Sequence, residues 1–308
     1  MFELLCRTTG APTALSLFTG TISILFMITN IPGNLLVILA VIIDPNKNLR
    51  NPFNLLIMNL AIADLIVGVV TNPLSIHVHF KEQNEEISDG EIKAIHMSYF
   101  ISCTASVLSI VLLACDRYIA LGYPIRYHVI MKRQTLFISV IFIWFLSISL
   151  PFIYFEVGYI RYAFIFANTS VVIAIIVTLF TYTRLLMKFS ARATSSYTED
   201  GSFDEQKHIT EMFIVVMIAV ICCYLPSTIL IYAMNFCKSC SCNTIHAFRD
   251  LQFVFVIANS SVNFFCYGFR SKKFRSAFKV ILRLKKSSAD VDNTNFSMNA
   301  TQGVTEVT

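Results

Sequence analysis

Long stretches without charge alternate along this chain with short clusters of charged residues. The clearest stretch runs from Lys93 to Arg117 and contains no Asp, Glu, Lys or Arg until Asp116. Because a helix rises about 1.5 Å per residue, this stretch is long enough to cross a hydrocarbon layer of roughly 30 Å. Charge returns at Asp116-Arg117-Tyr118, which suits a membrane interface. The pattern predicts a membrane-spanning helix.

Six further stretches have the same character, and only the second along the chain carries an internal charge, at Asp64. The first stretch is too long for the core of a signal peptide, so we predict an uncleaved span. The predicted spans cover residues 14–43, 51–79, 93–117, 133–156, 161–184, 211–238 and 250–270. We therefore predict an all-α membrane protein with a seven-transmembrane helix bundle.

The distribution of Lys and Arg predicts how the bundle is oriented. Of the 24 Lys and Arg residues, 18 fall on the side of the predicted membrane that holds the C-terminus. Cationic loops are retained in the cytoplasm. We expect the N-terminus outside and the C-terminus inside.

The two ends of the chain differ from the spans. Residues 1–13 are predicted to form a short extracellular N-terminus, followed by the seven-helix domain over residues 14–269. In residues 270–284 basic and apolar positions alternate with helical spacing, which predicts a short amphipathic cytoplasmic helix whose cations face anionic lipid headgroups. Residues 285–308 are rich in Ser, Thr, Asn and Asp, and we predict a disordered tail whose hydroxyls can accept phosphate.

The composition agrees with a membrane protein. Hydrophobic residues make up 56% of the chain, charged residues 14%, and the mean hydropathy is +0.66. The formal net charge of +5 does not indicate nucleic acid, because the basic residues flank apolar spans instead of alternating with polar aromatic residues. Membrane lipids are the expected anionic neighbours.

Polar residues inside the spans are the first candidates for function, because a charge in lipid is expensive. Asp64 lies in the middle of the second span, and Ser106, Asn259 and Asn263 lie at comparable depth on other helices. A carboxylate with hydroxyl and amide oxygens around it is typical of a small-cation pocket. The alternative is a protonated Asp64 held by hydrogen bonds.

Several motifs occur in order on the predicted spans and point to a known family. They are Gly33-Asn34, the run of residues 60–64, Asp116-Arg117-Tyr118, the single tryptophan Trp144, Cys223-Tyr224-Leu225-Pro226 and Asn263-Phe264-Phe265-Cys266-Tyr267. Any one of these alone would be weak. Together they make residues 14–284 resemble the rhodopsin-like (class A) G-protein-coupled receptors.

The resemblance assigns roles to particular residues. It implies that Asp64, Ser106, Asn259 and Asn263 form an allosteric sodium site, with no other cofactor. It also implies that Asp116 holds Arg117 at rest and releases it to meet the G protein. The remaining residues of this coupling switch would be Tyr118, Tyr182, Tyr224, Pro226 and Tyr267.

The chemistry of the switch also follows from the residues themselves. Loss of the Asp116 charge would free the Arg117 guanidinium, and Pro226 removes a backbone donor and kinks the sixth helix. The alternative for the Asp116-Arg117 pair is simple anchoring at the interface. By resemblance, Gln206 stands where an acid would latch Arg117 to the sixth helix, with Glu205 beside it, so the latch is expected to be weak or absent.

The resemblance implies partners as well as roles. These are an extracellular ligand, a heterotrimeric G protein, and arrestin acting through a phosphorylated tail, with the protein placed in the plasma membrane. Four departures from the usual pattern are similar to melanocortin, adenosine, cannabinoid and lysolipid receptors. The third helix lacks its outer cysteine, the second outer loop is short, the fifth span lacks proline, and cysteines crowd the third outer loop.

The same comparison suggests what the ligand is. Tyr99 stands where amine receptors carry an aspartate, and we place His96, Cys103 and Tyr224 with it around the ligand pocket. These side chains suit a small, largely apolar or neutral molecule, a lipid or a short peptide.

Four cysteines fall on the outer side, which is oxidising. They are Cys6, Cys237, Cys240 and Cys242. We expect one disulfide within the third outer loop and consider a tether to Cys6, in preference to zinc.

Two other functional classes fit the sequence less well. A seven-helix transporter or channel would need a polar path from face to face, whereas the polar residues here stop at a gated inner surface. An enzyme is not expected, because no nucleophile has a positioned base and no His and acidic cluster has metal-ligand spacing.

Overall fold

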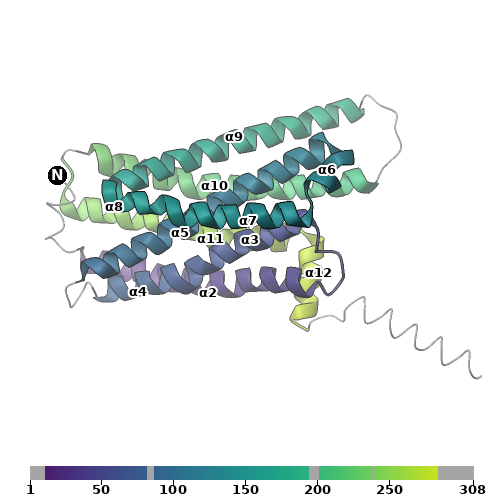
Figure 1. The fold of residues 1–308 in the computed structure, drawn as a ribbon. Helices are drawn as coiled ribbons and strands as arrows, with labels where there is room; N and C mark the ends of the chain where they lie inside the picture. The colour runs from purple at the N-terminus through teal and green to yellow at the C-terminus, as the bar shows by residue number, and fades with distance from the viewer. Residues whose placement is uncertain (1–10, 82–86, 194–200, 238, 284–308) are drawn as a thin grey trace, which may run out of the picture.

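The computed structural model describes residues 11–81, 87–193, 201–237 and 239–283, without the side chains of residues 182, 185, 186, 188–193 and 201–207. Seven long helical segments run side by side and form a bundle (Figure 1). In chain order their elements are α2 (Thr13–Ile43), α3 (Pro52–Ile66), η1 (Val67–Thr71), α4 (Asn72–Lys81), α5 (Asp89–Gly122), α7 (Arg133–Ser149), η2 (Leu150–Phe152), α8 (Ile153–Val157), α9 (Tyr159–Ala193), α10 (Gly201–Phe236) and α11 (Cys242–Arg270). All seven segments are long and apolar enough to cross a membrane, which confirms the predicted fold.

Two short helices, α6 (Pro124–Ile130) and α12 (Lys272–Ile281), lie at the same end of the bundle (Figure 1). We call this end the α12 end. The opposite end holds α8 and the connection between α10 and α11, and we call it the α8 end.

Local sequence signals explain where several helices begin. At the start of α3, Pro52 occupies the first turn and the Asn51 side chain accepts a hydrogen bond from the Asn54 backbone N–H. At the start of α5, Ser88 and Glu91 form a reciprocal capping box. Between α8 and α9 the chain turns at Gly158, whose φ of 83° favours glycine. These signals permit the short connections that keep neighbouring helices antiparallel.

The outward face of the bundle is apolar. On α7, Phe137 and Ile138 are each 66% exposed, and Phe142 and Phe145 are exposed on the same face. A continuous apolar stripe of this kind is unfavourable in water and suits lipid. Buried positions, in contrast, include many polar side chains. The chain is a multi-pass membrane protein whose polar groups face inward.

The short amphipathic helix expected after the seventh span is present as α12. Ser271 accepts a hydrogen bond from the Phe274 backbone N–H and so begins the helix. Phe274 and Phe278, one helical turn apart, are buried, whereas Leu282 lies beyond the end of the helix and is 56% exposed. Helix α12 packs against α2 and α11.

Gly33 lets α2 and α11 approach closely. A Cβ atom at Gly33 would lie only 2.7 Å from Cγ of Phe264. Phe264 also packs against Phe278 of α12, with 5.8 Å between the ring centroids. Gly33 therefore makes room for a large ring that joins α2, α11 and α12.

We predict that Gly33→Ala lowers the melting temperature of the purified protein by about 3 °C or more, because overpacking costs about 1–3 kcal/mol. The matched control is Gly122→Ala, since a Cβ atom there has no neighbour within 4 Å. Alanine is the better helix former at both positions. Equal melting temperatures for the two variants would contradict the close approach.

Candidate functional site

Asp64 is the centre of a buried polar cluster in the middle of the bundle. Asp64 is completely buried. Ser106 Oγ donates a hydrogen bond of 2.9 Å to Asp64 Oδ1, and Asn263 Nδ2 donates one of 2.8 Å to Oδ2. The structure thus brings together residues from α3, α5 and α11 that the sequence placed at comparable depth.

Two buried amide oxygens on α11, one of them on Asn263, which contacts this carboxylate, bear on cation binding. Within the described part of the chain, Asn259 Oδ1 and Asn263 Oδ1 are buried and accept no hydrogen bond. An unsatisfied buried acceptor costs about 1–3 kcal/mol. A hard cation takes carboxylate, amide and hydroxyl oxygens as ligands. The donor set therefore fits a small cation, and the cation would satisfy acceptors that hydrogen bonding to Asp64 leaves open.

Asp116 and Arg117 form a buried ion pair near the α12 end, with exposed fractions of 0% and 1%. Arg117 Nε lies 2.9 Å from Asp116 Oδ2, and a second guanidinium nitrogen contacts the same oxygen. The guanidinium also lies over the ring of Phe53, 4.2 Å from its centroid. The arginine is held by charge on one side and by an aromatic face on the other.

Tyr127, which the sequence did not single out, completes this pair. It lies on α6, and its hydroxyl donates a hydrogen bond of 2.8 Å to Asp116 Oδ1. Burial, together with the Asp116 carboxylate, raises the pKa of Tyr127, so the phenol stays protonated and remains a donor. The sequence signal that could have identified Tyr127 was its position three residues after Pro124, which begins the short helix α6.

Tyr118 does not join the pair. Its ring packs against Phe180 of α9, with centroids 5.1 Å apart, and the Arg184 guanidinium lies 5.1 Å from its centroid. Of the other switch residues, Pro226 lies inside α10. The side chain of Tyr182 lies outside the described residues.

Tyr267 lies on the same face of α11 as Asn259 and Asn263. It is 1% exposed, and its ring packs against Phe274 of α12 at 6.0 Å. Among the described residues, its hydroxyl has no hydrogen-bond partner. This face of α11 therefore continues from the Asp64 cluster to the α12 end.

A second ion pair joins α10 to α11 at the α12 end. Arg270, the last residue of α11, pairs with Glu211 of α10. His208 Nδ1 lies 3.6 Å from Glu211 Oε2. The side chains of Glu205 and Gln206, where the sequence placed a weak latch, lie outside the described residues, so that expectation stays a prediction.

The four predicted ligand-binding residues lie in the half of the bundle toward the α8 end. His96 Nδ1 lies 3.0 Å from the Tyr154 hydroxyl, and the His96 ring stacks on Tyr159 with centroids 4.1 Å apart. Tyr99, Cys103 and Tyr224 are buried deeper.

Gln252 of α11 connects these residues and was missed by sequence reasoning. It is completely buried. Its Oε1 accepts hydrogen bonds from Tyr99 Oη at 3.4 Å and Ser227 Oγ at 3.1 Å, and its Nε2 donates to Tyr159 Oη at 3.0 Å. We call these four residues the Gln252 network. It ties together α5, α9, α10 and α11.

The network leaves little space for a ligand. The space lined by Tyr99, Tyr224 and Ser227 measures about 200 Å³ and has no room for a water-sized molecule. Typical small-molecule sites measure about 300–1,000 Å³. The space between Tyr99, Tyr224 and Ser227 is therefore too small for a ligand in this conformation.

Another buried carboxylate, Asp250, lies near the α8 end. Thr19 Oγ1 donates to Asp250 Oδ2 at 3.3 Å, and Arg249 Nε lies 2.8 Å from Oδ1. His79 Nδ1 lies 3.9 Å from Asp250 Oδ2. These contacts tie α2, α4 and α11 together. In the part of the chain that the structure describes, no group of three or more His, Cys, Asp or Glu residues could hold a metal ion.

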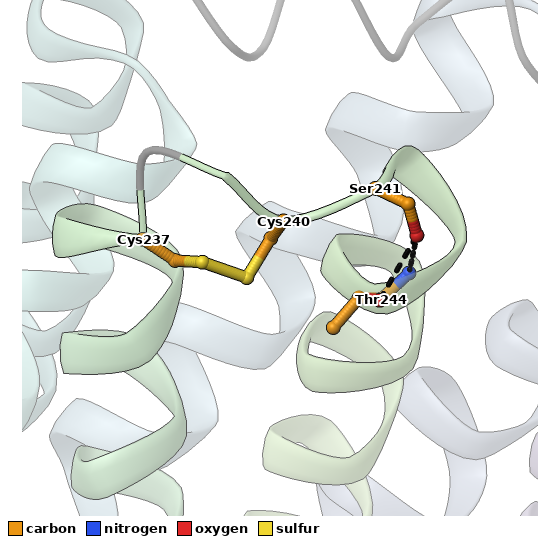
Figure 2. Close-up of a disulfide and its surroundings, with 4 residues drawn as sticks. All are labelled: Cys237, Cys240, Ser241 and Thr244. Carbon is orange, nitrogen blue, oxygen red and sulfur yellow. Dashed lines mark hydrogen bonds between the residues drawn. A yellow bond between two sulfur atoms is a disulfide. The ribbon is translucent and has the colours of Figure 1, made fainter.

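Two of the outer cysteines pair within the connection between α10 and α11. Cys237 and Cys240 form a disulfide, and the adjacent Ser241 begins α11 by accepting a hydrogen bond from the Thr244 backbone N–H (Figure 2). Cys242 is also disulfide-bonded. Cys6 lies outside the described residues.

Comparisons with known proteins address the family. The profile of the seven-transmembrane receptors of the rhodopsin family matches residues 33–161. The chain is 26% identical to the histamine H2 receptor of Canis lupus familiaris, over 91% of this chain and 83% of that receptor. It is 26% identical to melanocortin receptor 5 of Pan troglodytes, over 90% and 86%. It is 25% identical to galanin receptor 2a of Danio rerio, over 84% and 76%.

We predict that sodium raises the melting temperature of the purified wild-type protein and that Asp64→Asn abolishes this shift. At a sodium concentration ten times the dissociation constant, binding stabilises the folded state by about 1.4 kcal/mol, or a few degrees. The control is N-methylglucamine chloride at equal ionic strength. Asn259→Ala should reduce the shift. An equal sodium-dependent shift in wild type and Asp64→Asn would exclude this site.

Proposed function

Since the chain belongs to the rhodopsin family of seven-transmembrane receptors, whose members act through G proteins, we propose that it binds an extracellular ligand and activates a heterotrimeric G protein by guanine-nucleotide exchange. The observation that carries this proposal is the buried Asp116–Arg117–Tyr127 cluster at the α12 end. A buried cation with one removable partner is a two-state element. Its relatives are receptors, so neither an enzyme nor the alternative of a transporter or channel is favoured.

The proposed orientation places the protein in the plasma membrane with the α12 end in the cytoplasm and the N-terminus outside. Most Lys and Arg residues support it, because cationic loops stay inside. The Cys237–Cys240 disulfide supports it too, because the α8 end would then face an oxidising space.

The switch works through competition for Arg117. At rest Asp116 accepts hydrogen bonds from Arg117 and Tyr127, so the guanidinium points to the side of its own helix. Loss of the Asp116 charge, or movement of α6 with Tyr127, frees the guanidinium for a G protein. Pro226 lets the α12 end of α10 swing, since proline breaks the backbone hydrogen-bond ladder of a helix.

The Asp64 cluster is proposed to hold a sodium ion that favours the resting state. Asp64, Ser106, Asn259 and Asn263 would supply its oxygens, and the two open amide acceptors support this assignment. Because the ion would hold α3, α5 and α11 together, helix movement would have to release it. This gives sodium a negative effect on activation.

The ligand is proposed to be a small, largely apolar or neutral molecule, a lipid or a short peptide. His96, Tyr99, Cys103 and Tyr224 offer no negative charge, and nearby Asp250 is already paired with Arg249. The ligand must open the Gln252 network to enter. It would therefore carry neutral hydrogen-bonding groups that replace the partners of Gln252.

Two further partners are proposed. Membrane lipids would contact the exposed apolar stripe of α7 and the basic face of α12. Arrestin would bind a phosphorylated tail in residues 285–308, which lie outside the described residues.

We predict that Asp116→Asn raises basal nucleotide exchange about tenfold. Removing one partner of a buried ion pair costs about 3–5 kcal/mol. If the resting state alone loses about 1.4 kcal/mol of this, the equilibrium shifts tenfold toward the active state. The measurement is GTPγS binding to a purified G protein in the presence of receptor. Tyr127→Phe should give a smaller rise.

The matched control is Asp44→Asn, which alters another buried carboxylate at the α12 end, one that accepts the backbone N–H groups of Asn48 and Leu49. It should leave exchange unchanged. Equal effects of Asp44→Asn and Asp116→Asn would contradict the switch.

We predict that Glu211→Gln raises basal exchange two- to fivefold, because a half-exposed ion pair contributes up to about 1 kcal/mol. Reversing both charges, Glu211→Arg with Arg270→Glu, should restore the wild-type level. The same GTPγS assay checks both. If the reversed pair stays as active as the single variant, Glu211 and Arg270 do not restrain α10.

A further inference from the structure

The buried face of α2 changes character at the depth of the Asp64 cluster. Up to Asn34, the buried residues of this helix are all polar or glycine, and they are Ser16, Thr19, Gly20, Ser23, Asn30, Gly33 and Asn34. The buried residues that follow are Val37, Ala40 and Val41. The change occurs where Asn34 Nδ2 donates to the backbone carbonyl of Ser260, next to Asn259 on α11. The polar part of this face therefore covers only the half of α2 toward the α8 end.

The second span presents a matching face to α2, against which α4 packs (Figure 1). Outward from Asp64, buried polar or glycine residues recur every three or four positions, and they are Gly68, Thr71, Asn72, Ser75 and His79. Ser75 Oγ lies 3.1 Å from Ser23 Oγ, and a Cβ atom at Gly68 would overlap Asn30 Oδ1. The two polar faces are thus in direct contact, and we call this contact the polar seam.

The amides in the middle of the polar seam have no partner. Asn30 and Asn72 are completely buried, and among the described residues neither the nitrogen nor the oxygen of either amide makes a hydrogen bond. The buried Thr71 hydroxyl likewise makes none there. Leaving such groups unpaired is costly. A cation would satisfy the oxygens alone, whereas water both donates and accepts and so matches complete amides.

Close helix packing does not account for these amides. Small residues let membrane helices approach, and Ser, Thr and Asn side chains hydrogen-bond between helices. Ser23 and Ser75 fit that role, because their hydroxyls bond to each other. Asn30 and Asn72 do not fit it, because an amide that only joins helices would itself be paired. Their open groups indicate a polar occupant of the seam.

We propose that the polar seam holds a file of water molecules that leads from the α8 end to the Asp64 cluster, and that sodium reaches Asp64 along it. This inference rests on the proposed sodium site. An ion that passed the Gln252 network instead would meet a space without room for a water-sized molecule. Hydroxyl and amide oxygens along the seam replace part of the water shell of the moving ion.

The two ends of the seam differ, and this defines the route. At the outer end Thr19, one helical turn before Ser23, donates to Asp250, whose partner Arg249 has a 32% exposed side chain. At the inner end the buried face of α2 becomes apolar after Asn34. The seam therefore connects Asp64 with one side of the membrane only, whereas a transporter needs a path from face to face.

The experiment measures how fast silver ions react with cysteines introduced into the full-length protein in detergent. Ag⁺ carries the charge of sodium, and it binds a thiolate as the soft ligand it prefers, with release of the thiol proton. The variants are Ser75→Cys and Thr71→Cys in the seam. The control is Ser147→Cys, because Ser147 is equally buried but lies on α7. Protection from later alkylation, mapped by peptide mass spectrometry, reports each site separately.

We expect both seam cysteines to react about tenfold faster or more than Ser147→Cys, because a buried thiol away from a water path reacts only when the structure opens locally. Melting temperatures show that each variant is folded, and the second seam position serves if the first variant does not fold. Equal rates at the seam and at Ser147→Cys would overturn the route.

A second arm measures sodium exchange by ²³Na NMR relaxation. Gly68→Ala adds a methyl group beside Asn30 in the seam, whereas Gly20→Ala adds one against the ring of Phe80 in the same pair of helices. We expect Gly68→Ala to slow exchange about tenfold and Gly20→Ala to change it less than about twofold. Asn72→Leu, which removes an open amide, should slow exchange as well and replaces Gly68→Ala if that variant does not fold. Unchanged exchange in both would overturn entry through the seam.

The two arms separate this inference from the sodium site itself. Silver labelling of the seam without any sodium exchange in the wild type would contradict the sodium site and the ion's entry, and would leave only the water file. Sodium exchange without silver labelling of the seam would keep the sodium site and overturn the seam. Neither readout involves a G protein, so neither result bears on the proposed coupling.

Discussion

Hydrocarbon offers no partner for a polar group, and this constraint decides most of what the bundle does. Every polar side chain in a span must find its partner inside the protein. Asp64 does so through Ser106 and Asn263, and Asp116 through Arg117 and Tyr127. The contacts of Asp64 join α3 to α5 and α11, and the contacts of Asp116 hold the charge of Arg117 near the α12 end. The groups that stabilise the fold are therefore the groups whose rearrangement can carry a signal.

The unsatisfied groups follow one line along α11. Asn259, Asn263 and Tyr267 are all buried on the same face, and each has an oxygen without a hydrogen bond among the described residues. Any group that binds these three unsatisfied polar atoms would stabilise this conformation. The proposed sodium ion would satisfy the amide oxygens of Asn259 and Asn263, whereas the Tyr267 hydroxyl lies nearer the α12 end. This face of α11 therefore runs on one helix from the Asp64 cluster in the middle of the bundle to the α12 end.

The sequence predicted the spans, the amphipathic helix and the Asp116–Arg117 pair, because each depends on local pattern or on adjacent residues. The grouping of Asp64 with Ser106 and Asn263 came instead from their comparable depth on different helices and from the family resemblance. Uncharged length identified α5, and helical spacing identified α12. The pairing of Tyr127 with Asp116 spans eleven residues and a turn, and that of Gln252 with Tyr99 spans 153 residues. Such contacts depend on how helices pack side by side, which periodicity does not encode. The same holds for Glu211 and Arg270, whose charges looked like ordinary cytoplasmic flanks.

The hydrogen bonds of the Gln252 network limit which ligands can enter between its helices. Its three hydrogen bonds connect four helices, and each contributes about 1 kcal/mol net when intact but costs more when one buried partner is left open. An apolar ligand that only filled the space would separate Gln252 from Tyr99, Tyr159 and Ser227 and leave their polar groups unpaired. A ligand that offers a neutral donor and acceptor at the same place exchanges one set of bonds for another at little cost. A ligand of the proposed kind would therefore carry neutral polar groups on an otherwise apolar molecule, and its entry would break the hydrogen bonds that join Gln252 of α11 to α5, α9 and α10.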